Sequence, residues 1–323
     1  MKPPFVITAE ILNSVAEISR YIGMLGGLPT SLPSPRLRKQ NKIKTIKSTL
    51  AIEGNILSEA QITAIMDGKK VLGKPVEITE VRNAIDLYDQ MDQFNSSSLT
   101  SFKAAHKLLM AGIIDSAGRF RSGGVGIMKG RDISHIAPKA ALVPTLINEL
   151  LLWHKREKQL HPLIKGAILH YEIEFIHPFD DGNGRMGRFW QSLVLSEFDP
   201  LFRYLPVESL VERAQKKYYA ALETADKSAE STPFVAFMLR QILHALREFV
   251  QELEPAIDSR ELRLQKAAEH FRGEWFSRKE YLKLFLNIST ATASRDLRDA
   301  VVQSVVVSKG NGNRTEYHFF TPE

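Results

Sequence analysis

The run His177-Pro-Phe-Asp-Asp-Gly-Asn-Gly-Arg-Met-Gly-Arg188 concentrates chemically active side chains in one short segment. One imidazole, two carboxylates, a glycine-rich turn and two guanidiniums follow one another within twelve residues. Apolar residues at helical spacing come after them, so we expect a loop that opens a helix. This combination of residue types is typical of a site that handles the phosphates of a nucleotide.

The glycines of this run predict an anion-binding turn. Gly182-Asn-Gly184 stands between polar residues and the expected helix, so its backbone N–H groups can face a phosphate. The N-terminus of the helix adds the positive end of its dipole at the same place. The run lacks the Gly-Lys-Ser/Thr ending of a P-loop, which disfavours an NTPase of that class.

The charged residues of the run predict nucleotidyl transfer. Arg185 and Arg188 are three residues apart and therefore share one helix face, where two guanidiniums can hold a polyphosphate. Asp180 and Asp181 offer the oxygen ligands that Mg²⁺ prefers, unless one of them caps the helix. His177 precedes them, and an imidazole accepts protons near neutral pH.

The composition is that of an ordinary globular protein. The 323 residues are 25% charged and 44% hydrophobic, enough to bury a sizeable core in more than one domain. The lack of cysteine excludes disulfides and thiolate catalysis and suits a cytoplasmic protein. We expect no membrane span and no signal peptide, because apolar runs of the necessary length are missing. The net charge of +6 suits phosphate-bearing ligands or simple solubility.

Helical periodicity predicts a mainly α fold in three parts. They are a helical N-terminal region (1–95), a helical core (96–254) and a C-terminal module (255–323) that begins at Pro255. Within the core, the glycine-rich segment Gly118–Gly130 predicts a small β-hairpin. Individual helices are expected from Ser58 and over Glu77–Phe94, Ser101–Gly112, Ala140–Trp153, Leu163–Ile173, Gly187–Leu195 and Pro233–Phe249.

The C-terminal module has the pattern of a winged helix. Three short helices are expected, followed by the β-rich runs Val305–Ser308 and Glu316–Phe320 on either side of the turn Gly310–Asn313. Ser289–Arg298 would be the recognition-type helix of such a module, with Arg295 available to DNA. Because acidic residues accompany the basic ones, DNA binding and protein contact or dimerisation both fit the module.

The run His177–Arg188 resembles the signature of the Fic family, His-Pro-Phe-x-Asp/Glu-Gly-Asn-Gly-Arg-x-x-Arg, and meets every fixed position. Residues from roughly 40 to 250 also resemble that family in order and spacing. The resemblance implies a mostly helical protein that binds ATP and Mg²⁺. It further implies transfer of AMP to a Ser, Thr or Tyr hydroxyl of a target protein, possible targets including the chain itself.

The resemblance also implies a role for each matched residue. His177 would be the general base that deprotonates the target hydroxyl, and Asp181 would bind Mg²⁺. Arg188 would reach the γ-phosphate. The residues that would hold the phosphates of the nucleotide are Gly182, Asn183, Gly184, Arg185 and Arg188.

Two other segments resemble functional parts of the family. The hairpin would be a flap in which Ile127 and Met128 dock a segment of the target by strand addition. Tyr218 and Tyr219 resemble a nucleoside-facing segment, where an aromatic face can stack on adenine. A tyrosine pair on a helix fits an ordinary core equally well.

The segment Thr49-Leu-Ala-Ile-Glu-Gly54 resembles the family's inhibitory motif, Ser/Thr-x-x-x-Glu-Gly/Asn. Glu53 would pair with Arg188 and occupy the donors that the γ-phosphate needs. Its charge would also repel a polyphosphate. The same residues fit a helix end with Gly54 just after the cap, and both interpretations can hold at once.

Three other functions stay open. One is a DNA-binding regulator whose core only senses ATP. A second is a metal hydrolase that uses His170, His177 and Asp181, although the chain has no His-Glu-x-x-His motif. A third is removal of AMP from a target at the same site, with Glu53 orienting a water molecule.

Overall fold

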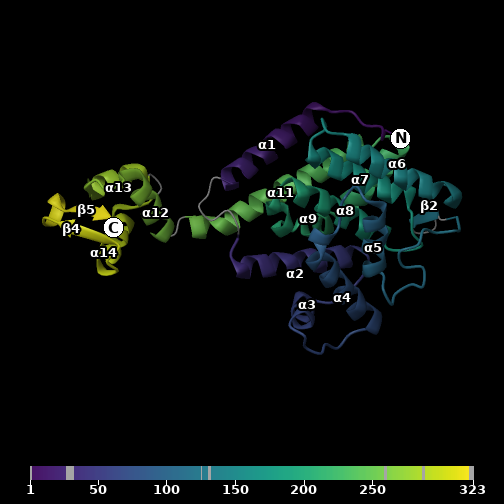
Figure 1. Cartoon of the computed structure of the whole chain (residues 1–323), viewed down its shortest axis with the longest axis horizontal. Helices are drawn as coiled ribbons and strands as arrows, with labels where there is room; N and C mark the ends of the chain where they lie inside the picture. Colours follow the sequence, from purple (N-terminus) through teal and green to yellow (C-terminus); the bar gives the residue numbers. More distant parts are fainter. Residues whose placement is uncertain are drawn as a thin grey trace. The chain divides into compact units, whose positions relative to one another are not determined.

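The computed structural model of the chain describes residues 2–26, 33–124, 126–129, 132–257, 260–285 and 288–319. The chain divides into two compact units, Met1–Phe249 and Val250–Glu323. Helices dominate both units (Figure 1), which confirms the mainly α fold predicted from the sequence.

The first unit is built almost entirely from helices. The α-helices that begin in it are α1 (Ala9–Gly26), α2 (Pro35–Ile52), α3 (Glu59–Met66), α4 (Pro75–Asp89), α5 (Leu99–Leu109), α6 (Val143–Arg156), α7 (Pro162–Ile176), α8 (Asn183–Phe198), α9 (Val207–Arg213), α10 (Gln215–Ser228) and α11 (Thr232–Ile257). Short 3₁₀ turns lie at η1 (Met91–Gln93), η2 (Ala140–Leu142) and η3 (Pro200–Tyr204).

Helices α7 and α8 lie at the centre of the first unit (Figure 1). Nearly all residues of α7 are buried, as expected of a helix that is apolar on every side. It packs against α8 and α6, and α2 also contacts α8. The run His177–Arg188 connects α7 to α8 and therefore lies between two largely buried helices.

Helices α2, α3 and α4 share a hydrophobic core of their own, and we call them the α2–α4 body. Ile46, Leu50 and Val81 are among the buried members of this core. Helix α3 follows Ser58, as predicted, and Ser58 and Gln61 form a capping box there. The shared core makes the three helices a packed assembly that includes the segment with the predicted inhibitory motif.

The glycine-rich segment forms the predicted β-hairpin. Its strands β1 (Gly126–Lys129) and β2 (Asp132–Ile136) pair antiparallel, with an irregularity between Ile127 and Met128. The side chains of both strands lie outside the described residues. The docking roles predicted for Ile127 and Met128 therefore stay predictions.

In its described residues the second unit contains the end of α11, three further α-helices and a small antiparallel sheet. Its elements are α12 (Arg260–Phe271), β3 (Phe276–Ser277), α13 (Arg278–Leu284), α14 (Thr290–Val302), β4 (Val306–Lys309), η4 (Gly312–Arg314) and β5 (Glu316–Phe319). The strand order is β3-β5-β4, so a short strand that the sequence did not predict joins the expected hairpin. Phe276, Tyr281 and Leu297 belong to the core of this unit. The winged-helix assignment and its DNA or dimer partners stay predictions.

Several helix ends differ from the predictions, among them the end of α4 and the start of α8. Helix α4 ends at Asp89 and not at Phe94, because the turn η1 continues the apolar pattern and buries Met91. Helix α8 begins at Asn183, earlier than predicted. Gly182 is its N-cap in left-handed backbone, with φ of 81°, so the loop needs only this one glycine to turn into the helix.

Helix α11 is longer than predicted. It continues past Pro255 to Ile257, because a proline inside a helix removes one backbone hydrogen bond without having to end the helix. The boundary between the two compact units falls within this helix, after Phe249.

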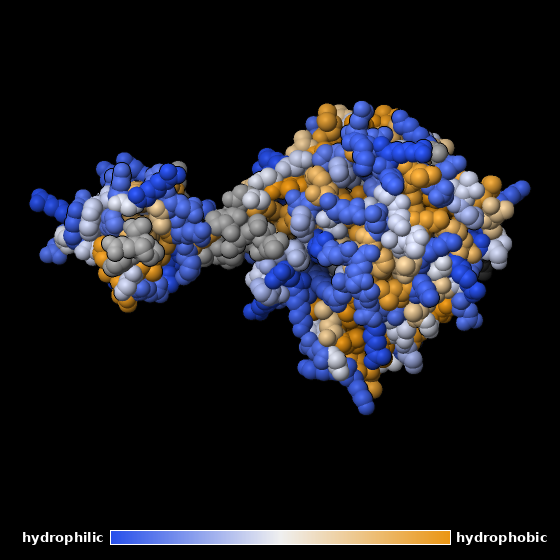
Figure 2. Space-filling model, in the orientation of Figure 1, coloured by the Kyte–Doolittle hydropathy of each residue, from blue (hydrophilic) through white to orange (hydrophobic). Residues whose placement is uncertain are grey.

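Hydrophilic residues cover most of the visible face of each unit, with apolar residues in patches between them (Figure 2). Large apolar side chains are exposed at scattered positions such as Ile56, Leu72 and Val302, as in most globular proteins. Within the described part of the chain, no helix has the length and apolar character needed to cross a membrane.

Candidate active site

The run His177–Arg188 forms the α7–α8 loop and the first turns of α8. Phe179 anchors this loop: it is fully buried, and its ring stacks on His106 with centroids 3.5 Å apart. The Asn183 side chain closes the loop, because it accepts from the Phe179 N–H and donates to the Phe179 carbonyl, both at 2.9 Å. Asn183 thus fixes the shape of the loop, and its predicted contact with a phosphate stays a prediction.

His106 of α5, which lies much earlier in the sequence, also contacts this loop. Its Nε2 lies 2.9 Å from the Asp181 carbonyl oxygen, and its Nδ1 accepts from the Gly118 N–H at 2.9 Å. Both contacts are satisfied by the neutral tautomer with the proton on Nε2. Burial lowers the pKa of His106 to about 4, so this imidazole stays neutral at physiological pH.

Arg121 joins the loop to the segment that follows the hairpin. Its guanidinium donates to the carbonyl oxygens of His177 (2.6 Å) and Pro138 (2.5 Å). It also donates to those of Gly123 (2.8 Å) and Ile176 (3.3 Å). His177 caps α7 with φ of 50°, a backbone conformation that costs energy for a residue with a side chain. Arg121 therefore stabilises a strained residue.

His177 is oriented as a proton acceptor. Its Nδ1 lies 3.4 Å from the Glu174 carbonyl oxygen, one turn back on α7. A bond donated from Nδ1 leaves the lone pair on Nε2. In this tautomer Nε2 is the basic nitrogen of the ring, and the role of His177 as a general base stays a prediction.

The structure brings Glu53 and Arg188 together. Glu53 Oε1 lies 2.7 Å from Arg188 Nη2. Thr49 accepts two further bonds from the same guanidinium, at 2.9 Å through its hydroxyl and at 3.0 Å through its carbonyl. Burial works against the charge of Glu53, but the charge and hydrogen bond of Arg188, with Arg185 and His177 adding to them, hold the pKa of Glu53 below its usual value. Arg188 is therefore buried together with Glu53, whose carboxylate neutralises its charge.

The end of α2 places Glu53 over Arg188. Glu53 is the C-cap of the helix, and Gly54 follows with φ of 94°. The Gly54 N–H donates to Ala51 at 3.0 Å and the Asn55 N–H donates to Leu50 at 3.1 Å, which is the pattern of a Schellman motif. Glu53-Gly54 therefore ends a helix and pairs with Arg188 at the same time.

The Glu53 side chain lies directly against Gly184. A Cβ at this position would be 2.5 Å from Glu53 Oε1, 3.1 Å from Glu174 Oε1 and 3.2 Å from Arg188 Nη1. Three charged or ionisable groups therefore meet over the first turn of α8. Arg188 Nη1 has no hydrogen-bond acceptor among the residues that the structure describes.

Arg185 is also engaged by carboxylates. Its Nη1 lies 2.7 Å from Glu80 Oε1 of α4, and its Nη2 lies 3.4 Å from Asp181 Oδ2. The Arg185 side chain is 4% exposed, whereas that of Asp181 is 53% exposed. Both arginines of the run are therefore buried against carboxylates of the α2–α4 body, Glu53 at the C-cap of α2 and Glu80 on α4.

A further carboxylate, Glu174, is buried beside this pair. Tyr218 Oη donates to Glu174 Oε1 at 2.9 Å and lies 3.0 Å from His170 Nε2. Burial raises the pKa of Glu174 to about 7; Arg188 acts in the opposite direction, and the charge of Glu53 adds to the increase. Glu174 is therefore an acid that titrates near neutral pH inside the candidate site.

This raised pKa predicts how stability depends on pH. Between about pH 4.5 and 7 the folded chain binds more protons at Glu174 than the unfolded chain does, so stability falls as pH rises. Glu174→Gln cannot ionise and can still accept the Tyr218 bond. We expect the variant to gain roughly 3 kcal/mol over wild type between about pH 4 and pH 8, measured by urea unfolding. A stability difference that does not change with pH would contradict the prediction.

The two tyrosines predicted to face the nucleoside differ in their surroundings. Tyr218 has no exposed surface and packs against Phe234 and Phe237. An enclosed ring has no free face for a ligand, so the structure favours the core interpretation for Tyr218. Tyr219 is 42% exposed, and stacking on a base stays a prediction for this residue.

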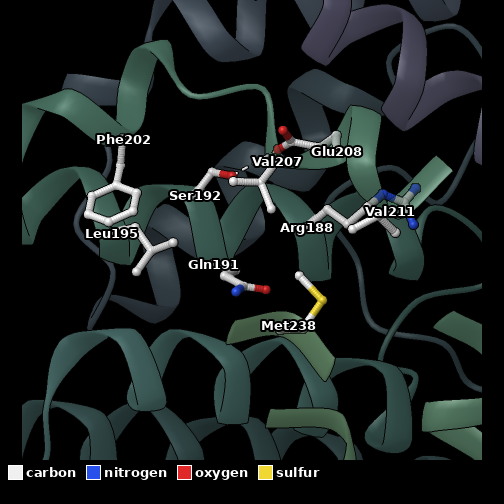
Figure 3. A pocket seen from close by; sticks show the side chains of 9 residues that line it. All are labelled: Arg188, Gln191, Ser192, Leu195, Phe202, Val207, Glu208, Val211 and Met238. Carbon is white, nitrogen blue, oxygen red and sulfur yellow. Dashed lines mark hydrogen bonds between the residues drawn. The ribbon is translucent and has the colours of Figure 1, made fainter. Parts of the chain in front are cut away.

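Figure 3 shows the interior side of Arg188. A cavity of about 10 Å³ lies there, lined by residues of α8, α9 and α11 that include Met238. Ser192 donates to Glu208 beside it at 2.9 Å. This volume holds about one water molecule and is far smaller than a ligand pocket. This cavity therefore cannot hold a polyphosphate.

Two predictions concern metal binding: a hydrolase site at His170, His177 and Asp181, and a magnesium ligand at Asp181. Within the described residues, no three His, Cys, Asp or Glu side chains come together in a way that could hold a metal ion. The hydrolase set is not assembled, because His170 is fully buried and bonded to Gln191 at 2.7 Å. Asp181 offers a half-exposed carboxylate next to Arg185. That donor fits Mg²⁺, which one or two carboxylates and substrate phosphates commonly hold.

Sequence reasoning missed four residues that shape this site. Glu174 lies three residues before His177 and could have been noticed by that spacing. The other three come from distant segments, and no motif connects them to the run. They are Glu80, His106 and Arg121.

The fold and this loop together define a class of protein: a helical core whose central loop joins a histidine, a glycine turn at a helix N-terminus and two arginines. Residues 96–195 match the Fic/DOC family. A crystal structure of a Fic family protein from Desulfovibrio desulfuricans is 40% identical, covers 100% of this chain and 99% of that chain, and has a TM-score of 0.76. The chain belongs to the Fic/DOC family.

More distant relatives carry functional names. The protein adenylyltransferase fic-1 of Caenorhabditis briggsae is 28% identical over 231 residues, which are 67% of this chain and 42% of the relative. The chain thus spans less than half the length of the curated relatives it matches. A solved fragment of Fic-1 from C. elegans is 22% identical, covers 76% of this chain and 73% of the fragment, and has a TM-score of 0.63. It shares the fold.

Proposed function

We propose that this chain transfers AMP from ATP to a hydroxyl group of a target protein, and that Glu53 inhibits the reaction. The observation that carries the proposal is the pairing of Glu53 with Arg188 at 2.7 Å, directly over Gly184. It supports a polyphosphate site that the chain's own carboxylate occupies. The relatives named protein adenylyltransferase support the same chemistry.

In the proposed reaction His177 Nε2 takes the proton of the target hydroxyl. The hydroxyl oxygen bonds to the α-phosphorus of ATP while the bond to the bridging oxygen breaks, and pyrophosphate leaves. The N–H groups at the N-terminus of α8 stabilise the charge on the phosphate, and Arg185 and Arg188 hold the terminal phosphates. Mg²⁺ held by Asp181 would offset part of the polyphosphate charge.

Glu53 inhibits this reaction for two physical reasons. It occupies the Arg188 Nη2 donor that a γ-phosphate needs. Its negative charge also repels a polyphosphate in a region where little solvent screens the interaction. Nucleotide binding in the reactive position therefore requires Glu53 to leave Arg188.

Replacing Glu53 by glycine is expected to increase protein labelling from α-labelled ATP and Mg²⁺. The gain should be roughly 10- to 100-fold over wild type, because a hydrogen bond between charged groups contributes about 1.5–3 kcal/mol. The measurement is label incorporated into the purified chain and into proteins of an added lysate.

Asp67→Gly is a matched control for this variant. Asp67 is also a helix C-cap followed by a glycine with positive φ, but it pairs with Lys39. Its replacement should leave labelling at the wild-type level. No labelling by Glu53→Gly would overturn AMP transfer from ATP, and equal labelling by wild type and Glu53→Gly would overturn inhibition. Release of AMP from a labelled target by wild type would favour AMP removal instead.

A further inference from the structure

Both arginines of the α8 N-terminus pair with a carboxylate at the same distance. Glu53 Oε1 lies 2.7 Å from Arg188, and Glu80 Oε1 lies 2.7 Å from Arg185. The two arginine side chains are 2% and 4% exposed. Two guanidiniums that would hold neighbouring phosphates therefore each pair closely with a carboxylate of the α2–α4 body, and Asp181 is a second, more distant partner of Arg185.

The two carboxylates belong to one packed assembly. Glu53 ends α2 and Glu80 lies on α4, and both helices contribute to the core of the α2–α4 body. Asn55 links them: it lies two residues after Glu53, and its Nδ2 donates to Glu80 Oε2 at 2.8 Å and to the Glu77 carbonyl at 3.1 Å. A displacement of the end of α2 therefore disturbs the partner of Arg185 as well as the partner of Arg188.

The balance of charge indicates whether a carboxylate that pairs with a buried arginine stays in place or leaves when a polyphosphate binds. A buried guanidinium needs a compensating negative charge, and its loss is strongly destabilising. Without a ligand, Glu53 compensates the charge of Arg188, and Glu80 compensates that of Arg185 with the half-exposed Asp181 farther away. A bound polyphosphate brings its own negative charges, and carboxylates that stayed in place would repel it in a poorly screened environment.

We propose that Glu80 is a second inhibitory carboxylate, which competes with a phosphate for Arg185 as Glu53 competes for Arg188. Glu53 and Glu80 together take the places of two adjacent phosphates of a polyphosphate. The inference rests on the proposed function only in assigning both arginines to phosphates. Its distinctive content is that the α2–α4 body blocks two phosphate positions and that removal of Glu53 frees only one.

Binding of inorganic tripolyphosphate to the full chain tests this proposal without requiring any transfer reaction. Isothermal titration calorimetry would compare wild type, Glu53→Gly, Glu80→Gln and the double variant. We expect the double variant to bind roughly tenfold more tightly than Glu53→Gly. Glu80→Gln alone should change the wild-type affinity less, because Glu53 still covers Arg188.

Glu212→Gln in the Glu53→Gly background is the matched control. Glu212 of α9 pairs with Lys47 of α2, so this variant also removes one negative charge and one ion pair made with the α2–α4 body. It should bind tripolyphosphate as Glu53→Gly does. Glu80→Asp, whose shorter side chain withdraws from Arg185, provides a second test if Glu80→Gln does not fold by circular dichroism.

The outcomes separate this proposal from the proposed function. If the double variant binds tripolyphosphate no better than Glu53→Gly, or does not bind it at all, Glu80 positions Arg185 or serves the fold, and the proposal is wrong. Absence of AMP labelling combined with the expected gain in affinity would reject AMP transfer and leave the role of Glu80 intact.

Discussion

His177→Ala in the Glu53→Gly background is expected to lower AMP labelling about 10²- to 10⁴-fold, the usual contribution of a general base. The Nδ1 of His177 faces the Glu174 carbonyl at 3.4 Å, so Nε2 is left to take the proton of the target hydroxyl. Alanine removes that nitrogen and leaves the carbonyl bond from Arg121 in place. The measurement is the initial rate of labelling from α-labelled ATP at saturating nucleotide.

The appropriate control is His244→Ala, also in the Glu53→Gly background. His244 is an exposed histidine of α11 in the same compact unit, and its removal should leave the rate unchanged. ATP affinity should stay within about threefold in both variants, since His177 acts on the target and not on the phosphates. A His177→Ala variant that folds and still labels proteins at the Glu53→Gly rate would show that another group takes the proton.

The parts of this protein that could be predicted are those encoded over short distances. Apolar spacing indicated most of the helices, and Ser58 indicated the start of α3 through its capping box. The run His177–Arg188 holds its chemistry in consecutive residues, so its functional interpretation needed no tertiary structure. Glu53 was noticed because it stands in a recognisable six-residue motif.

The contacts that could not be predicted join residues far apart in the sequence. Glu80 reaches Arg185 across 105 residues, and His106 reaches Asp181 across 75. Neither Glu80 nor His106 differs in its immediate sequence from a surface glutamate or a core histidine. Only the packing of α4 and α5 beside α8 gives these side chains their roles, and such packing does not follow from helical periodicity.

The burial of Tyr218 could not be predicted from the sequence either. The resemblance placed it near the nucleoside, but in the folded chain it donates a hydrogen bond to Glu174 and packs among phenylalanines. Its neighbour Tyr219 occupies another face of α10 and is 42% exposed. Adjacent residues of a helix point in different directions, so a pair of tyrosines can divide between core and surface.

Phe179→Ala is expected to destabilise the chain by about 3–5 kcal/mol, the usual cost of removing a buried phenylalanine ring. The ring has no exposed surface, stacks on His106 at 3.5 Å and lies 5.4 Å from the Phe102 ring. Truncation leaves a cavity directly beneath the loop that holds His177 and Asn183. The measurement is urea unfolding followed by circular dichroism.

Phe198→Ala is the matched control, because Phe198 at the end of α8 is 39% exposed. Its ring centroid lies 5.1 Å from that of His161 and 6.3 Å from that of Phe202. Phe198→Ala should cost less than half as much, since most of the ring is not enclosed. When it is introduced into the Glu53→Gly variant, Phe179→Ala should also abolish AMP labelling at temperatures where the chain stays folded, because the loop loses its anchor. Equal destabilisation by the two substitutions would mean that the α7–α8 loop is held by its backbone hydrogen bonds alone, and that Phe179 packing does not position His177.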